Sequence, residues 1–342
     1  MRRGGSRAIL LGGGLLAASA LLLAARPGEN TGSPASIALG SFARCEAYSG
    51  LPPGWPQRAD AGMVRVRAGL AELGSERGYA DERPVLREPV PGFRIDATEV
   101  SNAQFAAFVA ATGHTTEAER LGGGVVFASP ASDSAATPSS WWKFQPGANW
   151  RHPEGPGSSI AGRGNEPVVQ VSRADALAYA RWLGRDLPTE AEWESAAKAG
   201  LGNPEADLAV GTAELPRANF WQGNFPYADD ARDHYAGRAP VGCYAPNAYG
   251  LHDAVGNVWE WTRDDYRGPR QAHGHGDAAT AGAAHDGAVA VIKGGSFLCA
   301  ANFCVRYRAS ARHPQEVDLP TSHVGFRTVL RDGQAVARAE SQ

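Results

Sequence analysis

Two cysteines stand five positions apart near the C-terminal end of the chain. Cys299 and Cys304 occur in the segment GGSFLCAANFCVRYR, residues 294–308, and the 342-residue chain has only four cysteines in all. Arginines follow the second cysteine, and nearby positive charge lowers the pKa of a thiol. The spacing suits a disulfide that closes a short loop, a pair of thiolate metal ligands, or a redox-active dithiol. The spacing alone leaves all three interpretations open.

The composition is typical of an ordered globular protein with many turns. Hydrophobic residues make up 43% of the chain and charged residues 20%, which are ordinary values for a soluble domain. The 42 glycines and 23 prolines indicate short elements joined by turns. The chain is long enough to bury a core without covalent cross-links. A net charge of −3 provides no electrostatic footprint for nucleic acid, which excludes that class of partner.

The first 26 residues predict export. Arg2, Arg3 and Arg7 precede an uncharged apolar run at 8–25, the pattern of a signal peptide. The run is also near the shortest length that spans a membrane, so a retained signal anchor is the alternative. Residues 27–57 are rich in Pro, Gly and Ser and predict a flexible tether. We therefore expect a periplasmic or extracellular protein, possessing a membrane anchor if the segment is retained, in a compartment where disulfides persist.

The elements that must position the cysteines are predicted in one domain, residues 58–332, followed by a polar tail at 333–342. Helices are predicted to begin at three capping boxes and to end at a glycine: Ser101 to Gly113, Ser172 to Gly184 and Thr189 to Gly200. Short strands are predicted at 93–96, 167–171 and 288–296. The last of these leads into the Gly-Gly-Ser turn before Cys299. The fold class is α+β with few long elements.

Seven segments carry a resemblance to a known family, and they run in order along nearly the whole chain: DATEVSNAQFAAFV (96–109), ANWRHPEGP (148–156), RDLPTEAEWE (185–194), ANFWQGNFP (218–226), YGLHDAVGNVWEWT (249–262), GGSFLCAANFCVRYR (294–308) and SHVGFR (322–327). Together they resemble the formylglycine-generating enzymes, also called sulfatase-modifying factors. GNVWEW and LPTEAEWE occur across a wider superfamily, whereas Cys-x4-Cys after Gly-Gly-Ser is typical of the oxidases. The resemblance implies a single compact α+β domain, related to C-type lectins and poor in regular secondary structure.

The resemblance also indicates a bacterial-type member of the family. It places the two structural disulfides of the animal enzymes at Ala180 with Thr328 and at Ala197 with Ala309, where this chain has no cysteine. Cys45 and Cys243 have no counterpart in the family. They would either bond to each other or remain free thiols.

The implied activity is the oxidation, by O2, of the cysteine in a Cys-x-Pro-x-Arg motif of an unfolded sulfatase to Cα-formylglycine. The resemblance assigns Cys299 and Cys304 as catalytic copper ligands, and thiolates are the soft ligands that suit Cu(I). It assigns Ser296 as a third catalytic residue that orients the oxygen or a proton. The substrate-binding residues that it implies are Trp259, Trp150 and Arg151.

Two structural cation sites follow from the same resemblance. The first consists of Asn219, the Phe220 carbonyl, Asp233 and the Tyr235 carbonyl, and the second of Asp253, the Gly256 and Val258 carbonyls and Glu260. Carboxylate, amide and carbonyl oxygens are the ligands that Ca²⁺ prefers. At the second site, sodium is the alternative.

Two other functions compete with this prediction. One is a superfamily member with other oxidative chemistry, such as an iron-dependent sulfoxide synthase, which would need a histidine-rich ligand set. The other is a non-catalytic, lectin-like binding paralogue. Such paralogues typically lose one or both pocket cysteines, whereas this chain retains Cys299 and Cys304.

Overall fold

The computed structural model describes residues 39–131, 137–202, 206, 210–270 and 288–332. The predicted export segment at 1–26, the first part of the tether and the polar tail at 333–342 lie outside these residues. No helix within the described ranges is long and apolar enough to span a membrane.

The three predicted helices are confirmed, and each begins at its predicted capping box. The hydroxyls of Ser101, Ser172 and Thr189 accept a hydrogen bond from the backbone N–H three residues on, which satisfies a donor that the helix leaves unpaired. The α-helices in the described ranges are α1 (Phe42–Glu46), α2 (Asn102–Thr112), α3 (Glu117–Leu121), α4 (Arg173–Trp182) and α5 (Glu190–Lys198), and 3-10 turns occupy Ala80–Glu82 and Pro138–Trp141.

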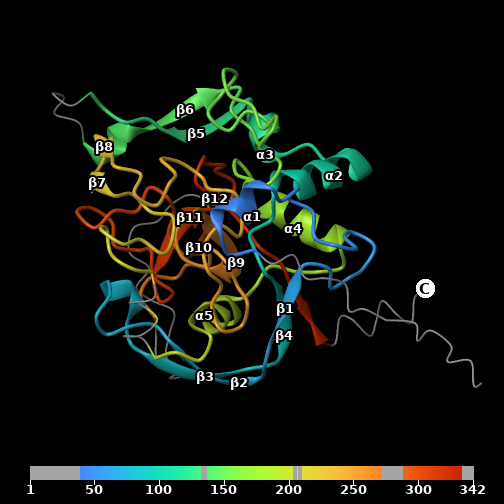
Figure 1. Ribbon diagram of the computed structural model, residues 1–342, viewed down its shortest axis with the longest axis vertical. Helices are drawn as coiled ribbons and strands as arrows, with labels where there is room; N and C mark the ends of the chain where they lie inside the picture. The colour runs from blue at the N-terminus through green and yellow to red at the C-terminus, as the bar shows by residue number, and fades with distance from the viewer. Residues whose placement is uncertain (1–38, 132–136, 203–205, 207–209, 271–287, 333–342) are drawn as a thin grey trace, which may run out of the picture. The chain divides into compact units, whose positions relative to one another are not determined.

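The strands are short and form several small sheets (Figure 1). A three-stranded antiparallel sheet has the order β1-β4-β13, with β1 at Met63–Val66, β4 at Phe93–Asp96 and β13 at Val329–Arg331. A four-stranded sheet has the order β11-β10-β9-β12, with β9 at Trp259–Asp265, β10 at Val289–Lys293, β11 at Arg312–Glu316 and β12 at Val324–Gly325. The hairpins are β2 (Gly69–Leu73) with β3 (Leu86–Val90), β5 (Gly123–Phe127) with β6 (Trp142–Pro146), and β7 (Gly223–Asn224) with β8 (Ala228–Asp229).

Two predicted strands are confirmed and the third is wrong. Strand β4 matches residues 93–96, and β10 covers the centre of 288–296. In the predicted strand at 167–171, only Pro167 makes a β-bridge, to Ser101. Gln170 has a φ of 59°, and a left-handed residue interrupts an extended ladder. The segment instead packs Val168 and Val171 into the core.

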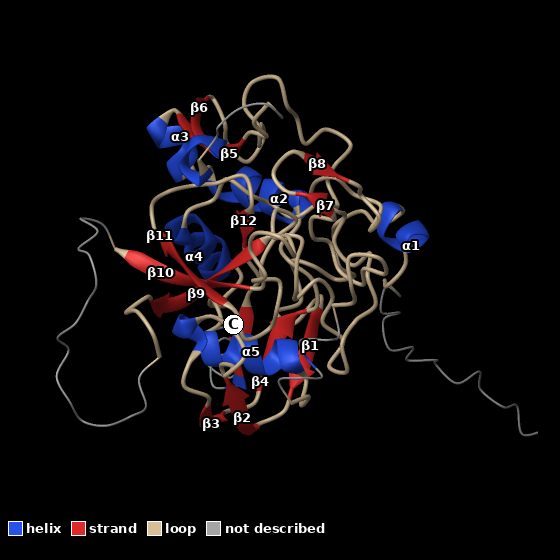
Figure 2. Cartoon of the chain, turned by 90° about the vertical axis from the view of Figure 1, so that its left-hand side faces the viewer, coloured by secondary structure: helices blue, strands red, loops and turns tan. Residues whose placement is uncertain are grey.

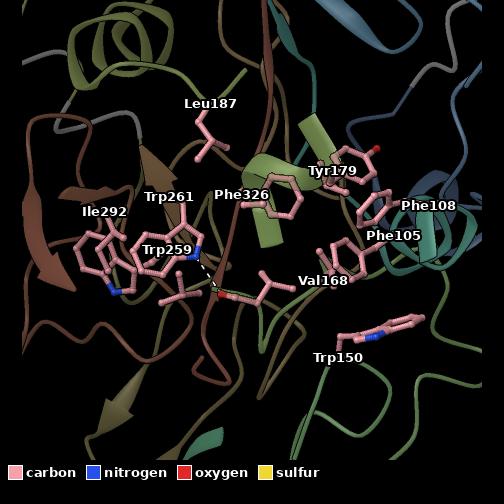
Figure 3. Packing of buried hydrophobic residues seen from close by; sticks show 14 of the residues in the cluster. Phe105, Phe108, Trp150, Val168, Tyr179, Leu187, Trp259, Trp261, Ile292 and Phe326 are labelled. Atoms are coloured by element: carbon pink, nitrogen blue, oxygen red, sulfur yellow. Dashed lines mark hydrogen bonds between the residues drawn. The ribbon is translucent and has the colours of Figure 1, made fainter. Parts of the chain in front are cut away.

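The main core joins the four-stranded sheet to the helices. Figure 3 shows Trp259, Trp261 and Ile292 on one side of this cluster, and Phe105, Phe108 and Tyr179 of α2 and α4 on the other. Strand β9 lies between α4 and α5 in Figure 2 and contacts both helices. Cys299 belongs to the same cluster, and Cys304 packs against it. The core therefore fixes the environment of the cysteine pair.

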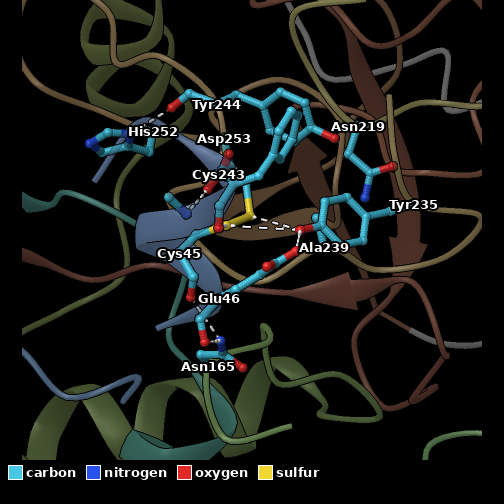
Figure 4. The surroundings of a disulfide bond; sticks show 12 residues. Cys45, Glu46, Asn165, Asn219, Tyr235, Ala239, Cys243, Tyr244, His252 and Asp253 are labelled. Atoms are coloured by element: carbon cyan, nitrogen blue, oxygen red, sulfur yellow. Dashed lines mark hydrogen bonds between the residues drawn. A yellow bond between two sulfur atoms is a disulfide. The ribbon is translucent and has the colours of Figure 1, made fainter. Parts of the chain in front are cut away.

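The described part of the predicted tether is folded, which corrects the expectation for residues 39–57. Cys45 is fully buried, and Trp55 belongs to the main core. Cys45 and Cys243 form a disulfide across 198 residues of sequence, and the Tyr235 hydroxyl lies 3.5 Å from Cys243 Sγ (Figure 4). Apolar burial and this cross-link hold a segment whose composition alone predicts flexibility.

Candidate active site and cation sites

Cys299 and Cys304 lie side by side as free thiols. Their Sγ atoms are 3.8 Å apart and are not bonded. Cys299 is buried, whereas Cys304 is partly exposed. A substrate or a metal ion would therefore reach the pair from the Cys304 side.

The two thiols have opposite pKa shifts. The hydrogen bond with Cys304 and burial both raise the pKa of Cys299 well above its usual value. The pKa of Cys304 is lowered to about 7, first by the hydrogen bond from Cys299 and then by the Arg306 backbone and the positive charges of Arg306 and Arg308, against the effect of burial. The thiolate is the reactive and metal-binding form of a cysteine. Because of its lower pKa, Cys304 is the more reactive thiol of the pair near neutral pH.

The Gly-Gly-Ser turn that follows β10 holds Cys299 in place. Gly295 has a φ of +80°, and a Cβ at this position would lie 2.7 Å from Tyr307 Cα. Only glycine permits this close approach between the turn and the segment that follows Cys304. Ser296 is fully buried, and its carbonyl accepts a hydrogen bond of 2.9 Å from the Cys299 N–H. Ser296 therefore lies in the turn that leads to Cys299, and its predicted role as a third catalytic residue stays a prediction.

The loops that carry the predicted cation ligands are hydrogen-bonded directly to this turn and the residues that follow it. The Trp221 N–H donates to the Cys299 carbonyl at 2.9 Å, and the Phe297 N–H donates to the Asn257 carbonyl at 2.9 Å. The Asn219 side chain donates to Asn257 Oδ1 at 3.0 Å. A disturbance of either cation loop would therefore reach the cysteine turn through one or two hydrogen bonds.

In the first predicted set of cation ligands, the side-chain amide nitrogen of Gln222 is hydrogen-bonded to oxygens of Asp233 and Phe220. Asp233 Oδ2 accepts hydrogen bonds from the Phe220 N–H at 2.9 Å and from Gln222 Nε2 at 2.6 Å. Gln222 Nε2 also donates to the Phe220 carbonyl. Asn219 Oδ1 is buried and has no hydrogen-bond partner among the residues that the structure describes. Burial raises the pKa of Asp233 to about 7. A cation bound to the Asp233 and Asn219 oxygens would therefore offset the cost of burying the ionised carboxylate. The Tyr235 N–H, at 3.1 Å from Asp233 Oδ1, completes this turn.

In the second predicted set, Glu260 already has a cationic partner. Its two carboxylate oxygens accept hydrogen bonds of 2.6 Å from Nε and Nη2 of Arg327, and both side chains are buried. Trp193 Nε1 adds a third hydrogen bond of 2.6 Å. The Gly256 and Val258 carbonyls lie in the loop that leads to this carboxylate. A bidentate pair of this kind leaves little of the Glu260 charge uncompensated.

A second carboxylate beside Asp253 escaped the sequence prediction. Glu99 is fully buried, and within the described part of the chain its Oε2 atom has no hydrogen-bond partner; the same holds for Asp253 Oδ1. Burial, followed by repulsion from Asp253, raises the pKa of Glu99 well above its usual value. Burial likewise raises the pKa of Asp253. Glu99 lies in the DATEVSN segment, and no local pattern indicates that it meets Asp253, which is far away in the sequence.

The donor types fit the expected metals. Two thiols at 3.8 Å are soft ligands of the kind that bind Cu(I). The unpartnered buried oxygens of Asn219, Asp253 and Glu99 are hard ligands that suit Ca²⁺. No group of three or more His, Cys, Asp or Glu side chains that could hold a metal ion occurs in the described ranges. The fit of the cation loops therefore depends on carbonyl and amide oxygens as well.

The predicted substrate-binding residues differ in their exposure to solvent. Trp259 and Trp150 are each 3% exposed, and the Trp259 ring stacks on His313 at 5.5 Å. Arg151 is exposed, lies 4.1 Å from the Trp150 ring and pairs with Glu119. Trp259 shares the core cluster of Cys299. Their roles in substrate binding stay predictions.

Comparison with known proteins identifies the family. The sequence pattern of the sulfatase-modifying factor enzyme 1-like domain matches residues 48–332. The chain belongs to this family. A formylglycine-generating enzyme from Thermomonospora curvata is 44% identical over 307 residues, covering 81% of this chain and 96% of that enzyme. A formylglycine-generating enzyme from Mus musculus is 41% identical over 308 residues, covering 84% of this chain and 82% of that enzyme.

The fold of the sulfatase-modifying factor family is confirmed as well. The solved structure of PvdO from Pseudomonas aeruginosa matches with a TM-score of 0.52 and 23% identity, covering 80% of this chain and 95% of that one. At this level of identity the match concerns the fold alone. The predicted single α+β domain with short elements is therefore confirmed. The family match begins at residue 48, within the segment predicted as a tether.

Proposed function

We propose that this chain is an enzyme that converts a cysteine of a sulfatase to Cα-formylglycine. Relatives named formylglycine-generating enzymes cover more than four-fifths of the chain. The observation that carries the proposal is the free thiol pair, with Sγ atoms 3.8 Å apart and Cys304 open to the surface. A binding paralogue would not need a free, asymmetric thiol pair at this position.

The substrate of this proposal is an unfolded sulfatase segment with a Cys-x-Pro-x-Arg motif. Cys304 lies in a segment without regular secondary structure, next to the exposed Phe303. An extended peptide could therefore bring its own cysteine beside the pair. Trp259, Trp150 and Arg151 are the proposed substrate-binding residues, of which Arg151 is the exposed one.

The proposed cofactor is Cu(I), held by Cys299 and Cys304, with O2 as the oxidant. Bound there, the metal would accept a substrate thiolate as a further soft ligand and supply one-electron chemistry toward O2. The chain's own groups contribute the rest. Cys304 provides a thiolate near neutral pH, and the buried Ser296 orients the oxygen or a proton near Cys299.

Calcium is the proposed structural cation at both loops, and Glu99 is added here to the second set. The supporting observations are the unpartnered buried oxygens of Asn219, Asp253 and Glu99. Because the first loop donates the Trp221 hydrogen bond to Cys299, a cation there would stiffen the support of the active site.

The proposed location is outside the cytoplasm, in the periplasm or beyond it, with membrane anchoring if the apolar run at 8–25 is retained. The basic residues before that run support export. The Cys45–Cys243 disulfide is of the kind that persists in oxidising compartments.

The decisive experiment is mass spectrometry of a Cys-x-Pro-x-Arg peptide incubated with the protein, Cu(I) and O2. The peptide should lose the mass that corresponds to replacing its CH2–SH group by an aldehyde. Metal-free protein and the Cys304→Ser variant serve as controls and should leave the peptide unchanged. If wild-type protein loaded with copper never oxidises the peptide, the chain is a binding paralogue and the proposal fails.

A further inference from the structure

The segment that carries Cys304 depends on a distant part of the chain for its position. Cys299 is fixed by the turn after β10, but residues 301–308 form turns and irregular backbone. Within its own segment, the Cys304 N–H donates to the Ala300 carbonyl at 2.9 Å, and the Arg306 backbone is hydrogen-bonded to the Cys304 thiol. The geometry of the thiol pair therefore needs support from elsewhere.

That support comes from the turn Tyr79–Glu82, more than 220 residues earlier in the chain. The Val305 N–H, the first backbone donor after Cys304, donates to the Tyr79 hydroxyl at 3.1 Å across a separation of 226 residues. The Arg306 guanidinium lies 3.9 Å from the centre of the Tyr79 ring. The Tyr79 side chain thus contacts both of the residues that follow Cys304, Val305 and Arg306.

Two ion pairs extend this attachment along the next residues. Arg306 donates to Asp81 at 3.0 Å, and Arg308 donates to Glu82 at 2.9 Å. Glu82 is fully buried, and buried charge-assisted hydrogen bonds are stronger than exposed ones. The arginines that follow the cysteine are therefore tied to the turn rather than directed to solvent.

The turn itself is built to hold this shape. The Tyr79 N–H donates to Glu82 Oε1 at 3.1 Å, which closes the 3-10 turn Ala80–Glu82. A Cβ on Gly78 would lie 1.8 Å from the Glu82 carboxylate, so any other residue at position 78 would displace that carboxylate. The turn is thus rigid around the groups that contact the Cys304 segment.

We propose that Tyr79 is a positioning residue that, with Asp81 and Glu82, sets Cys304 against Cys299 in the arrangement that receives the metal. The inference rests on the proposed copper centre. The turn Tyr79–Glu82 acts on the metal only through the Cys304 segment. Without the Tyr79 hydroxyl, Cys304 would occupy the paired arrangement for a smaller fraction of the time, and apparent Cu(I) affinity falls by that fraction.

The test compares Tyr79→Phe with wild type in two measurements. Cu(I) affinity is measured anaerobically against a competing chelator, and the rate of alkylation of each cysteine by iodoacetamide is measured in metal-free protein by peptide mapping. Loss of one hydrogen bond should weaken Cu(I) binding by about tenfold. Alkylation should become faster at Cys304, while Cys299 stays protected.

Controls separate positioning from general destabilisation. Tyr249→Phe removes a hydroxyl from a half-buried tyrosine that packs on a different core cluster and should change neither measurement. Asp81→Asn is a second variant, which weakens the Arg306 contact and should act in the same direction as Tyr79→Phe. Its matched control is Asp332→Asn, at an exposed pair with Arg65.

The outcomes distinguish this inference from the proposed function. If wild type binds Cu(I) and Tyr79→Phe matches it in both affinity and Cys304 alkylation, the positioning role is refuted. If wild type binds no Cu(I), the copper proposal fails, and the alkylation rates alone still decide whether the turn holds Cys304. Equal acceleration at both cysteines would indicate general loosening and would also overturn the inference.

Discussion

At the scale of single residues, the two cysteines share a site but differ in environment. Cys299 is buried within the core, whereas Cys304 lies beside two arginines on a partly exposed segment. The hydrogen bond with Cys304 and burial raise the pKa of Cys299, whereas the pKa of Cys304 is lowered to about 7. Such a pair can bind a soft metal as a unit, because neither thiolate alone would hold it.

The first prediction concerns that unit. Cys299→Ser and Cys304→Ser should each abolish stoichiometric Cu(I) binding and peptide oxidation, because a hydroxyl is a hard, weakly acidic ligand. The double variant should be scarcely worse than either single one, since residues that act together are not additive. Copper content and peptide mass are measured on the same samples. A purely structural disulfide would instead leave activity intact and lower stability by roughly 2–4 kcal/mol.

A second prediction at this scale concerns His323. Burial lowers its pKa to about 3, and the ring lies 4.5 Å from Trp142. The unfolded chain, with an ordinary histidine pKa, binds the proton first, so the free energy of unfolding should fall as the pH drops below 6.5. The loss from this residue should reach roughly 2 kcal/mol at pH 5.

The measurement is denaturant unfolding between pH 7 and 5 for wild type and His323→Gln. The variant should show a flatter dependence on pH by about the predicted amount, whatever its absolute stability. Parallel curves for the two proteins would show that His323 does not carry this effect.

At the scale of elements, irregular loops rather than helices or strands build the site. The loop around Asn219 and the loop around Asn257 contact each other and the Gly-Gly-Ser turn. Loops of this kind have many backbone groups to satisfy and few repeating hydrogen bonds. Cations bound by the buried oxygens of these loops would stabilise them.

The third prediction is that calcium removal lowers the melting temperature. A ligand present at 100 times its Kd stabilises the folded state by about 2.7 kcal/mol, and chelation removes this contribution. Thermal unfolding is compared with and without a chelator, and calcium is then added back. Asp233→Asn should blunt the response, whereas Asp265→Asn, at an exposed pair with Arg173, should preserve it. An unchanged melting temperature after chelation would contradict the cation assignment.

Across the whole domain, contacts between segments that are far apart in the sequence hold the described residues together. The Cys45–Cys243 disulfide joins residues 198 positions apart, and strand β13, near the C-terminus, pairs with β4 near the start of the domain. Cys45 and Cys243 form a small cluster with Ala239 and Tyr244, separate from the main core that contains Cys299. The cross-link therefore supports the fold at a distance from the thiol pair.

The fourth prediction follows from this separation. Replacing both Cys45 and Cys243 by serine should lower the free energy of unfolding by roughly 2–5 kcal/mol, because a long loop is no longer closed in the unfolded chain. Peptide oxidation at a temperature where the variant is folded should persist. Chemical denaturation and the peptide assay test the two statements. Lost activity in a folded variant would assign the disulfide a role in catalysis.

Features that depend on neighbouring residues could be predicted from the sequence. Capping boxes at Ser101, Ser172 and Thr189 predicted three helices, because their hydrogen bonds span only three residues. The Cys-x4-Cys spacing likewise predicted the pairing of Cys299 with Cys304, and the family segments predicted the fold.

Contacts between groups that are distant in the sequence could not be predicted, because they depend on how the whole domain packs. The segment predicted as a strand at 167–171 is interrupted by Gln170, whose backbone is left-handed. The described part of the predicted tether, residues 39–57, is folded and is held by the Cys45–Cys243 disulfide. Glu99 reaches Asn257 across 158 residues, and Tyr79 reaches Val305 across 226. No local pattern records such contacts, because they arise when the buried core brings separate segments together, and the free energy that selects them belongs to the packing of the whole domain.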